Sequence, residues 1–412
     1  MRQRAVITGV GAITPAGSNA EESWDAISHG ESGVTTLTRV DAEAANLSSQ
    51  IAGEVSFDTD CYDCIDERRM GRYAQLGIAA SLEAVEDADI DFDEKERELD
   101  AGRVGVSMGS GIGGFPEIEE GVTGDRVDPY FALRFLPNLA AGYVSELIDA
   151  QGPNRAPATA CAASTHAIGD ALTDIRTGEA DIMIAGGCEA TLAPTAIRGF
   201  DAMRALSTRN DAPTKASRPF DADRDGFVMA EGAGVIVLEA AEHAAARGTE
   251  PIAELTGFAR TADAHHPTKP PDDAHGLRQS METAIDDADR PPHAIDHINA
   301  HATSTPRGDQ HEATAIRSVF DDPPLVTSTK SMIGHTLGAS GAIEAITCAK
   351  AVQNGIRPPT INYETPDDAC DVPVITTQQT ADVDVVLSNS AGFGGSNGTL
   401  VFEQISEDVT AA

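Results

Sequence analysis

The sequence predicts an α/β protein in which helices cover buried sheets, and two features of its 412 residues lead to this prediction. Short runs that are apolar on both faces alternate with longer stretches of helical periodicity, as expected for strands buried between helical layers. The order of these segments in the first part of the chain is echoed in the second part, which favours an internal duplication.

The expected elements follow one another in the order of an α/β protein. The strand-like runs are residues 5–10, 103–108, 182–185, 234–238 and 383–387. The helical patterns between them include residues 73–88 and 165–177. The acidic stretch 83–100 is expected to form a solvated helix end and a surface loop. Residues 262–273, which are rich in His, Pro and Asp, are expected to form a long loop.

The echo between the two parts of the chain consists of short similar segments. Residues 6–10 resemble 254–258, residues 158–161 resemble 298–301, and residues 184–187 and 232–239 resemble 387–390 and 398–403. Their shared order predicts two halves, residues 1–250 and 251–412, with a boundary near residue 250. In a duplicated α/β protein the active site is expected between the halves, at the carboxyl ends of strands.

The formal net charge of −37 argues against binding to nucleic acid or to an anionic membrane, because both would repel the protein. The chain has only five lysines, and its acidic residues are spread along its length. Such an acidic surface with few lysines favours adaptation to high salt, where screening removes the self-repulsion. An ordinary acidic cytosolic enzyme is the alternative interpretation.

The number of cysteines, the pattern at the N-terminus and the short apolar runs together predict a cytoplasmic protein. Six cysteines are too few for a disulfide framework in a chain of this length. Cys61 and Cys64 lack a second pair at zinc spacing, so they are expected to be structural or incidental. The N-terminal residues run directly into a strand-like pattern, which does not resemble a signal peptide, and no apolar run reaches membrane-spanning length.

Cys161 lies among small residues immediately before a helical pattern. A thiol at a helix N-terminus is close to the positive end of the helix dipole and to free N–H groups, which favours the thiolate and makes a nucleophile. A small buried cysteine in a packed turn is equally consistent with this segment alone. Cys188, at the end of a Gly-rich strand, is expected to be a core residue.

Three further segments contain residues suited to catalysis. His301 follows an apolar strand and precedes a polar turn, and Glu312 lies near the start of the next expected helix. In a chain that nearly lacks lysine, Lys330 occupies a turn of small residues five positions before His335. The Gly-rich turn around Phe393 lacks the Lys-Ser/Thr of a phosphate-binding loop. It is therefore expected to bring backbone N–H groups close to a substrate oxygen.

Together these four segments resemble the β-ketoacyl-acyl carrier protein synthase family, most closely its elongating type II branch. The resemblance runs nearly end to end and includes residues 109–114, 204–211 and 217–221. It implies a thiolase-like fold, with duplicated βαβαβαββ halves arranged in five α-β-α-β-α layers. The implied function is that of 3-oxoacyl-[acyl-carrier-protein] synthase II: decarboxylative Claisen condensation of an acyl-enzyme thioester with malonyl-acyl carrier protein in fatty acid elongation. No cofactor is implied.

The resemblance also implies roles for the catalytic residues. Cys161 would take an acyl group from a thioester, and malonyl-thioester would then enter and lose CO2. His301 and His335 would donate hydrogen bonds to the thioester oxygen of the resulting enolate. The carbanion would attack the acyl group on Cys161, and backbone N–H groups of Cys161 and Phe393 would stabilise the oxyanion.

Other residues would support this chemistry. Lys330 and Glu312 would set the electrostatics and the orientation of the two histidines. Phe393 would also act as a gate that moves once the cysteine is acylated. Ile112 would lie along the acyl pocket, and Phe131 would reach that pocket from a partner subunit, which implies a homodimer.

The resemblance finally implies a carrier and a cation. The substrates would be carried by acyl carrier protein or by coenzyme A. The arginines at the family's docking positions are Arg68, Arg69, Arg72, Arg126 and Arg209. The alternative is that they only pair with neighbouring carboxylates. A structural monovalent cation would be held by Asn299, Glu344, Ser388 and Asn389, although these side chains would also suit hydrogen bonds to one another.

One position departs from the family pattern, and several related activities compete. Ala302 stands where a glycine usually follows the catalytic histidine, so a left-handed backbone there would be strained. A polyketide-type ketosynthase or a coenzyme A-dependent condensing enzyme is the main alternative. A non-catalytic chain-length factor usually lacks the nucleophile that Cys161 provides. Thiolases have a second catalytic cysteine, and initiating synthases pair histidine with asparagine, so both are disfavoured.

Overall fold

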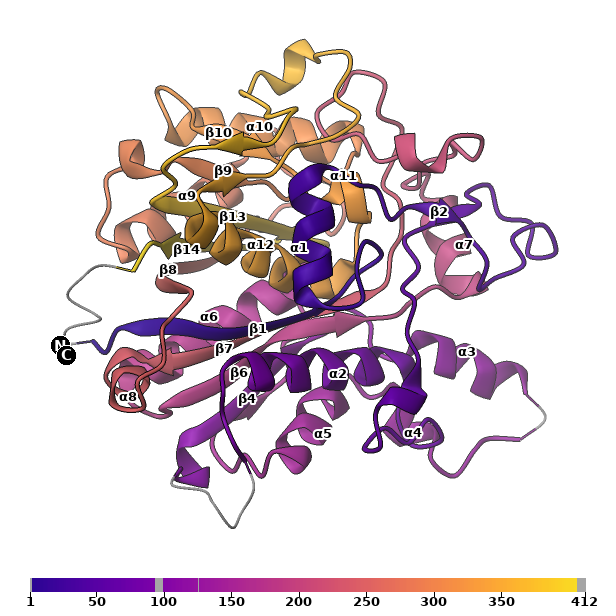
Figure 1. The fold of residues 1–412 in the computed structure, drawn as a ribbon. Helices are drawn as coiled ribbons and strands as arrows, with labels where there is room; N and C mark the ends of the chain where they lie inside the picture. The colour runs from indigo at the N-terminus through magenta and orange to yellow at the C-terminus, as the bar shows by residue number, and fades with distance from the viewer. Residues whose placement is uncertain (1, 93–98, 125, 406–412) are drawn as a thin grey trace.

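The computed structural model describes residues 2–92, 99–124 and 126–405, which form a layered α/β protein (Figure 1). The main strands of the first half are β1 (Ala5–Ile13), β4 (Val104–Gly109), β5 (Asn154–Arg155), β6 (Ile182–Glu189) and β7 (Gly232–Ala240). Those of the second half are β8 (Ala253–Ala262), β9 (His297–Asn299), β10 (Leu325–Thr327), β13 (Val385–Gly392) and β14 (Ser396–Glu403). Two small sheets pair β2 (Thr35–Thr36) with β3 (Ile51–Ala52), and β11 (Ile356–Arg357) with β12 (Gln379–Thr380).

The helices divide between the same two halves. In the first half they are α1 (Ala20–His29), α2 (Arg72–Asp87), α3 (Phe115–Thr123), α4 (Phe131–Phe135), α5 (Leu139–Leu147), α6 (Ala163–Thr177), α7 (Pro194–Ala202) and α8 (Ala241–Ala246). In the second half they are α9 (His275–Asp287), α10 (Pro306–Val319), α11 (Lys330–Ile333) and α12 (Ser340–Asn354). No helix in the described ranges combines the length and the apolar character that crossing a membrane requires.

Both halves have the same strand topology. In the first half the order is β1-β7-β6-β4-β5, with β6, β4 and β5 parallel and β7 antiparallel to its neighbours. In the second half β8, β14, β13, β9 and β10 repeat this order and these directions. The halves meet where β1 pairs with β8 at two positions, Val6 opposite Glu254 and Ile7 opposite Ala253. We propose that the boundary between them lies near residue 250, in the connection from α8 to β8.

The helices form three layers around the two half-sheets. Helices α6 and α12 lie in the middle and contact strands of both halves, while α2 and α5 cover the outer face of the first half and α9 and α10 that of the second (Figure 1). The two middle helices approach each other closely at Gly341. A Cβ atom there would lie 1.9 Å from the hydroxyl oxygen of Thr165, so only glycine leaves room for this approach. The expected five α-β-α-β-α layers of a thiolase-like fold are therefore confirmed.

One of the segment matches between the halves is wrong. The topology makes β1 equivalent to β8, β6 to β13 and β7 to β14, as the other matches predict. Residues 158–161, however, lie between β5 and α6, whereas residues 298–301 lie at the end of β9, whose counterpart is β4. The equivalent of the Cys161 turn is instead the short 3-10 turn Leu337–Ala339 before α12. Both turns begin with a non-glycine residue of positive φ, 52° at Ala160 and 48° at Leu337.

Candidate functional site

A cavity of about 640 Å³ opens between the two halves. Its lining includes Cys161 from the first half and His301, His335 and Phe393 from the second. The loops that carry these residues follow strands β5, β9, β10 and β13, so each emerges at the carboxyl end of a parallel strand. This is where α/β proteins place their ligand sites, because side chains from separate strands meet there.

Cys161 lies on the 3-10 turn Ala160–Ala162, which leads directly into the 15-residue helix α6. Ala160 has φ 52°, a strained conformation for a residue with a side chain, and it bends the chain just before the thiol. The backbone N–H of Phe393 lies close enough to the thiol to lower its pKa. A side chain at Gly392 would clash with the carbonyl of Thr159 at 2.7 Å, so glycine is needed for this turn to pack on the cysteine loop.

The thiolate expected at rest from the helix position is not favoured in this site. Cys161 is 9% exposed, and burial raises its pKa to about 12, although the charge of Lys330 acts in the opposite direction. Desolvation outweighs the nearby positive charge because the thiolate would lose its water without gaining a direct ion pair. The Cys161 sulfur lies 3.0 Å from Nε2 of His335, whose N–H can donate a hydrogen bond to it.

The loop around His335 is held by its backbone and by one hydroxyl. The backbone N–H of His335 donates to the carbonyl of Val228 at 2.7 Å, and Nδ1 of His335 lies 3.0 Å from the hydroxyl of Ser340. The imidazole stands edge-on to the ring of Phe227, with centroids 5.4 Å apart and an interplanar angle of 81°. These contacts fix the ring and leave Nε2 directed at the thiol.

His301 is positioned through its main chain. The two oxygens of Glu312, on α10, accept the N–H groups of His301 at 2.9 Å and Ala302 at 2.7 Å. The rings of His301 and His335 are nearly perpendicular, at 85°, with centroids 5.4 Å apart. Glu312 therefore orients His301 without touching its imidazole, as a positioning residue.

Burial keeps both imidazoles neutral. It lowers the pKa of His301 and of His335 well below the ordinary value, and the positive charge of Lys330 lowers both further. A neutral imidazole with hydrogen on Nε2 can donate to a substrate oxygen, and the Ser340 hydroxyl can supply the matching hydrogen bond to Nδ1 of His335. The pair is thus suited to stabilise an oxyanion without competing for protons from solvent.

Lys330 is 1% exposed and forms an ion pair with Glu344 on α12. Burial raises the pKa of Glu344 to about 7, against the attraction of the lysine. The lysine does not contact either histidine through a hydrogen bond in the described structure, so its effect on them is electrostatic. Its expected role in setting the electrostatics of the two histidines stays a prediction.

The four residues expected to hold a cation are all buried in the interior, and two of them have side-chain oxygens without a partner in the described chain. Asn299, Glu344, Ser388 and Asn389 are at most 2% exposed. Within the described chain, the side-chain oxygen of Asn299 and the second carboxylate oxygen of Glu344 have no hydrogen-bond partner. Asn389 donates to Glu312 and accepts from Thr399, so it is satisfied by the protein. Hard oxygen ligands left without a partner would suit a monovalent cation.

Ala302 does not need the left-handed backbone that would strain it. The positive φ in this loop, 69°, belongs to Ser304, two residues later. The hydroxyl of Ser304 accepts the N–H of Arg218 at 2.9 Å, which holds the turn. The difference from the family pattern at Ala302 therefore leaves the loop intact.

The five docking arginines do not share one role. The guanidinium of Arg72 is largely buried and donates twice to Glu231, at 2.8 Å for each bond, so it is not free for a partner. Arg68, Arg69 and Arg126 are exposed. Arg209 donates to the backbone carbonyl of Asp223 and is about one-third exposed. The expectation for Arg72 was wrong because the start of α2 packs against the loop that precedes β7.

The two residues expected at the acyl pocket lie differently. Ile112 lines the cavity. Phe131, on α4, packs against Phe135 with tilted rings whose centroids are 4.8 Å apart, and it is not among the residues of its own chain that line the cavity. Its expected place in a partner's pocket stays a prediction. Cys188 is fully buried in the core, as expected, and Cys61 and Cys64 are free thiols.

Several residues of the site were not predicted from the sequence. Glu189, at the end of β6, is fully buried, accepts N–H groups from residues 111, 112, 113 and 338, and has its pKa raised to about 7 by burial. It ties the loop that carries Ile112 to the loop after His335. Its place at a strand's carboxyl end was the one available signal. Ser340 and His311 carry no recognisable sequence signal.

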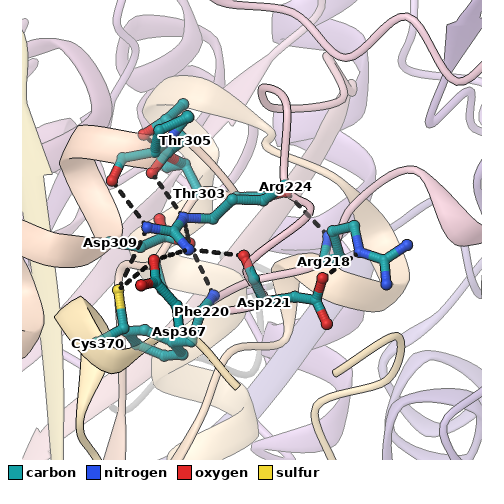
Figure 2. A network of polar contacts seen from close by, with 12 residues as sticks. Arg218, Phe220, Asp221, Arg224, Thr303, Thr305, Asp309, Asp367 and Cys370 are labelled. Carbon is teal, nitrogen blue, oxygen red and sulfur yellow. Dashed lines mark hydrogen bonds and ion pairs between the residues drawn. The ribbon is translucent and has the colours of Figure 1, made fainter. Parts of the chain in front are cut away.

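The lining of the cavity also depends on a polar network behind it. Arg224 is buried and donates to Asp367, at 2.7 Å, and to the carbonyls of Asp221 and Pro306 at 2.6 and 2.8 Å (Figure 2). It also lies 3.5 Å from Asp309, whose pKa burial raises to about 7. The network fixes the loop between His301 and α10, which forms one wall of the cavity.

Comparisons with known proteins agree with this geometry. The family model described as "Beta-ketoacyl synthase, N-terminal domain" matches residues 2–244, and "Beta-ketoacyl synthase, C-terminal domain" matches residues 252–364. A protein of Vibrio harveyi named 3-oxoacyl-[acyl-carrier-protein] synthase 2 is 42% identical over 420 residues, covering 98% of this chain and 100% of the relative. One of the same name from Staphylococcus aureus strain COL is 44% identical over 414 residues, covering 98% of each.

Solved structures give the same picture. A beta-ketoacyl synthase from Burkholderia phymatum STM815 is 35% identical, with a TM-score of 0.91 over 98% of this chain and 100% of that chain. A chain from a type II polyketide synthase acyl-carrier protein in complex with its ketosynthase is 32% identical, with a TM-score of 0.91 and the same coverage.

Proposed function

Since the chain belongs to the β-ketoacyl synthase family, it is a condensing acyltransferase, and we propose that the cavity around Cys161 joins an acyl group to a malonyl unit delivered by acyl carrier protein. The reaction is the decarboxylative Claisen condensation of fatty acid elongation. The observation that supports it most is the cluster formed by the Cys161 sulfur and the nitrogens of His301 and His335. These atoms all lie within 4.8 Å of one another at the cavity wall.

In the first step the thiol of Cys161 attacks the acyl thioester. A carbon–sulfur bond to Cys161 forms, the bond to the carrier's sulfur breaks, and the proton of the Cys161 thiol is transferred to the departing thiolate. Nε2 of His335 lies 3.0 Å from the sulfur, so its N–H can stabilise the negative charge that develops there during the attack. Because burial raises the pKa of the thiol to about 12, the thiol loses its proton during the attack and is not already a thiolate before it.

In the second step the malonyl group loses CO2. The breaking carbon–carbon bond leaves its electrons on the thioester enolate, whose oxygen accepts hydrogen bonds from the neutral imidazoles of His301 and His335. The enolate carbon then attacks the acyl carbonyl, and the N–H groups of Cys161 and Phe393 hold the oxyanion. Collapse of this intermediate releases the 3-oxoacyl carrier and the Cys161 thiolate, which takes one proton from solvent.

The test is a direct assay of substrate and nucleophile. Wild type and Cys161→Ser would be incubated with acyl and malonyl groups on acyl carrier protein and on coenzyme A, and the products weighed by mass spectrometry. We expect a 3-oxoacyl product two carbons longer and an acyl adduct on Cys161 in wild type, and neither in the variant. An adduct on Cys188 instead of Cys161 would overturn the assignment.

A polyketide-type condensation is the second candidate, because one similar structure is that of a polyketide ketosynthase complex. The named sequence relatives favour fatty acid elongation. The same assay separates the two: repeated condensation without reduction, giving poly-3-oxo products, would identify a polyketide activity.

Two structural features belong to this proposal. We propose a homodimer in which Phe131 reaches the acyl pocket of the partner subunit. Phe131→Ala should then change the preferred acyl length while leaving Cys161 acylation by short donors.

We also propose a monovalent cation held by Asn299, Glu344, Ser388 and Asn389. Crystals soaked in a rubidium salt should show anomalous density there, and its absence would contradict the site.

A further inference from the structure

Most basic side chains in the described part of this acidic protein are engaged with carboxylates or with other oxygen acceptors. Within the described ranges, those with neither a hydrogen bond nor an ion pair are the side chains of Arg69, Arg126, Arg204, Lys215, Lys269 and Arg307. In a chain with a formal net charge of −37, a cation that lacks an internal partner is uncommon. Where such cations gather is therefore informative about an external anion.

Three of these unpaired cations line the catalytic cavity. Arg204 follows α7, Lys269 lies between β8 and α9, and Arg307 is in the first turn of α10. All three are exposed, so they stand at the mouth of the cavity. Three separate segments thus bring uncompensated positive charge to one opening.

The acidic residues of the same lining do not neutralise this charge. Asp263 is buried and accepts a hydrogen bond from Asn397 at 2.7 Å, and Glu312 is buried and holds the backbone of His301. Both carboxylates therefore already have partners below the surface.

The backbone that presents Arg307 is fixed. The guanidinium of Arg224 donates to the carbonyls of the two residues immediately before it, Thr305 at 3.3 Å and Pro306 at 2.8 Å (Figure 2). Because the backbone is already fixed, only the rotamer freedom of the Arg307 side chain is lost when it binds a ligand.

The same face of α10 continues toward the catalytic centre with a second unsatisfied group. His311 lies four residues after Arg307, lines the cavity and is 8% exposed. Its Nε2 has no hydrogen-bond partner in the described structure. A polar wall thus runs from the charged mouth to the reactive centre.

We propose that Lys269 and Arg307 form an anion clamp for the phosphate of the phosphopantetheine arm that carries the substrate, with His311 offering a hydrogen bond to an amide of the arm. Arginine matches phosphate oxygens in pairs, and lysine adds a point charge. The proposal rests on the proposed function and names the part of the substrate that the mouth recognises. The phosphate is shared by acyl carrier protein and coenzyme A.

The test compares donors with and without that phosphate. The same acyl group would be presented on acyl carrier protein, on coenzyme A and on pantetheine, which lacks the phosphate. Wild type would be compared with the double variant Lys269→Ala, Arg307→Ala. The matched control is Lys215→Ala, Arg278→Ala, which removes the same two charges from exposed positions outside the cavity.

We expect the preference for phosphate-bearing donors over pantetheine, as a ratio of kcat/KM, to fall by about tenfold in the double variant, through KM. The control should keep the wild-type ratio. Equal changes for all three donors would overturn the clamp. An effect limited to coenzyme A would assign these cations to its nucleotide phosphates and would also overturn it. Failure of wild type to condense any donor would instead count against the proposed function.

Discussion

At the residue scale, the reactive centre depends on groups kept neutral by burial. His301 and His335 are both buried beside the positive charge of Lys330, and both effects lower their pKa. A neutral donor beside a developing oxyanion is already oriented before the reaction, because its supporting contacts come from Glu312 and Ser340. The proposed chemistry would therefore rely on preorganised dipoles more than on charged catalysts.

The first prediction concerns these two donors. His301→Ala and His335→Ala should each slow CO2 release from malonyl-thioester by about 10²–10³, the usual result of removing one oxyanion donor. Some acylation of Cys161 should remain in His301→Ala, since His301 does not contact the thiol. CO2 release and acyl-enzyme mass would be measured separately. Unchanged CO2 release in both variants would contradict the assignment.

The second prediction is a pH dependence of the thiol. Because burial raises the pKa of Cys161 to about 12, the thiolate is a minor form at neutral pH and increases as pH rises. Alkylation of the resting enzyme by iodoacetamide should therefore accelerate by about tenfold per pH unit between pH 7 and 9. Lys330→Met should slow alkylation at each pH, since the lysine charge lowers that pKa. A plateau below pH 8 would show a standing thiolate.

The residues proposed to react could be singled out from the sequence, but not all the residues that support them. Cys161, His301 and His335 stand at positions where motif and element boundary coincide. Ser340 and Glu189 act through partners that only the folded chain supplies, and a serine or glutamate alone has no distinctive pattern. The raised pKa of Cys161 could not be predicted either, because it depends on burial by residues distant in sequence.

At the element scale, buried strands were the most predictable feature. The apolar run 103–108 begins one residue before β4 and then follows it, the run 182–185 lies within β6, and the pattern 165–177 lies within α6. The predicted equivalence of residues 158–161 and 298–301 was wrong. Both segments are rich in small residues, but one precedes a helix and the other ends a strand, and these places are not equivalent in the two halves. Arg72 failed likewise: position at a helix start did not reveal that Glu231 would bind its side chain.

The third prediction concerns the exposed arginines that precede α2. Arg68→Glu with Arg69→Glu should raise KM for acyl carrier protein donors by about tenfold and leave coenzyme A donors nearly unchanged, because docking pairs surfaces of opposite charge. The control is Arg39→Glu, an exposed arginine near Glu231. Equal effects on both kinds of donor at the same salt concentration would show that these arginines are not a carrier dock.

At the scale of the whole molecule, the surface and the interior differ in how strongly their interactions depend on charge. The catalytic cavity lies between two halves joined by one short strand pairing and by the shared middle helices α6 and α12. These interior contacts are apolar or locally paired, so they depend little on ionic strength. The surface carries most of the excess negative charge, and its mutual repulsion acts against the compact state.

The last prediction follows from that separation. Exposed carboxylates repel over about 10 Å at 0.1 M salt but only about 3 Å at 1 M, so KCl should stabilise the fold. We expect Tm to rise by about 10 °C or more between 0.1 and 2 M KCl. An equal osmolality of sucrose controls for exclusion of cosolvent from the surface.

A variant with Glu250→Gln, Asp286→Asn and Asp289→Asn, all exposed, should gain stability at low salt and show a smaller rise of Tm with KCl. A Tm that is independent of KCl, or an identical rise in this variant, would show that self-repulsion does not limit the stability of the protein and would leave the acidic composition without a role in adaptation to high salt.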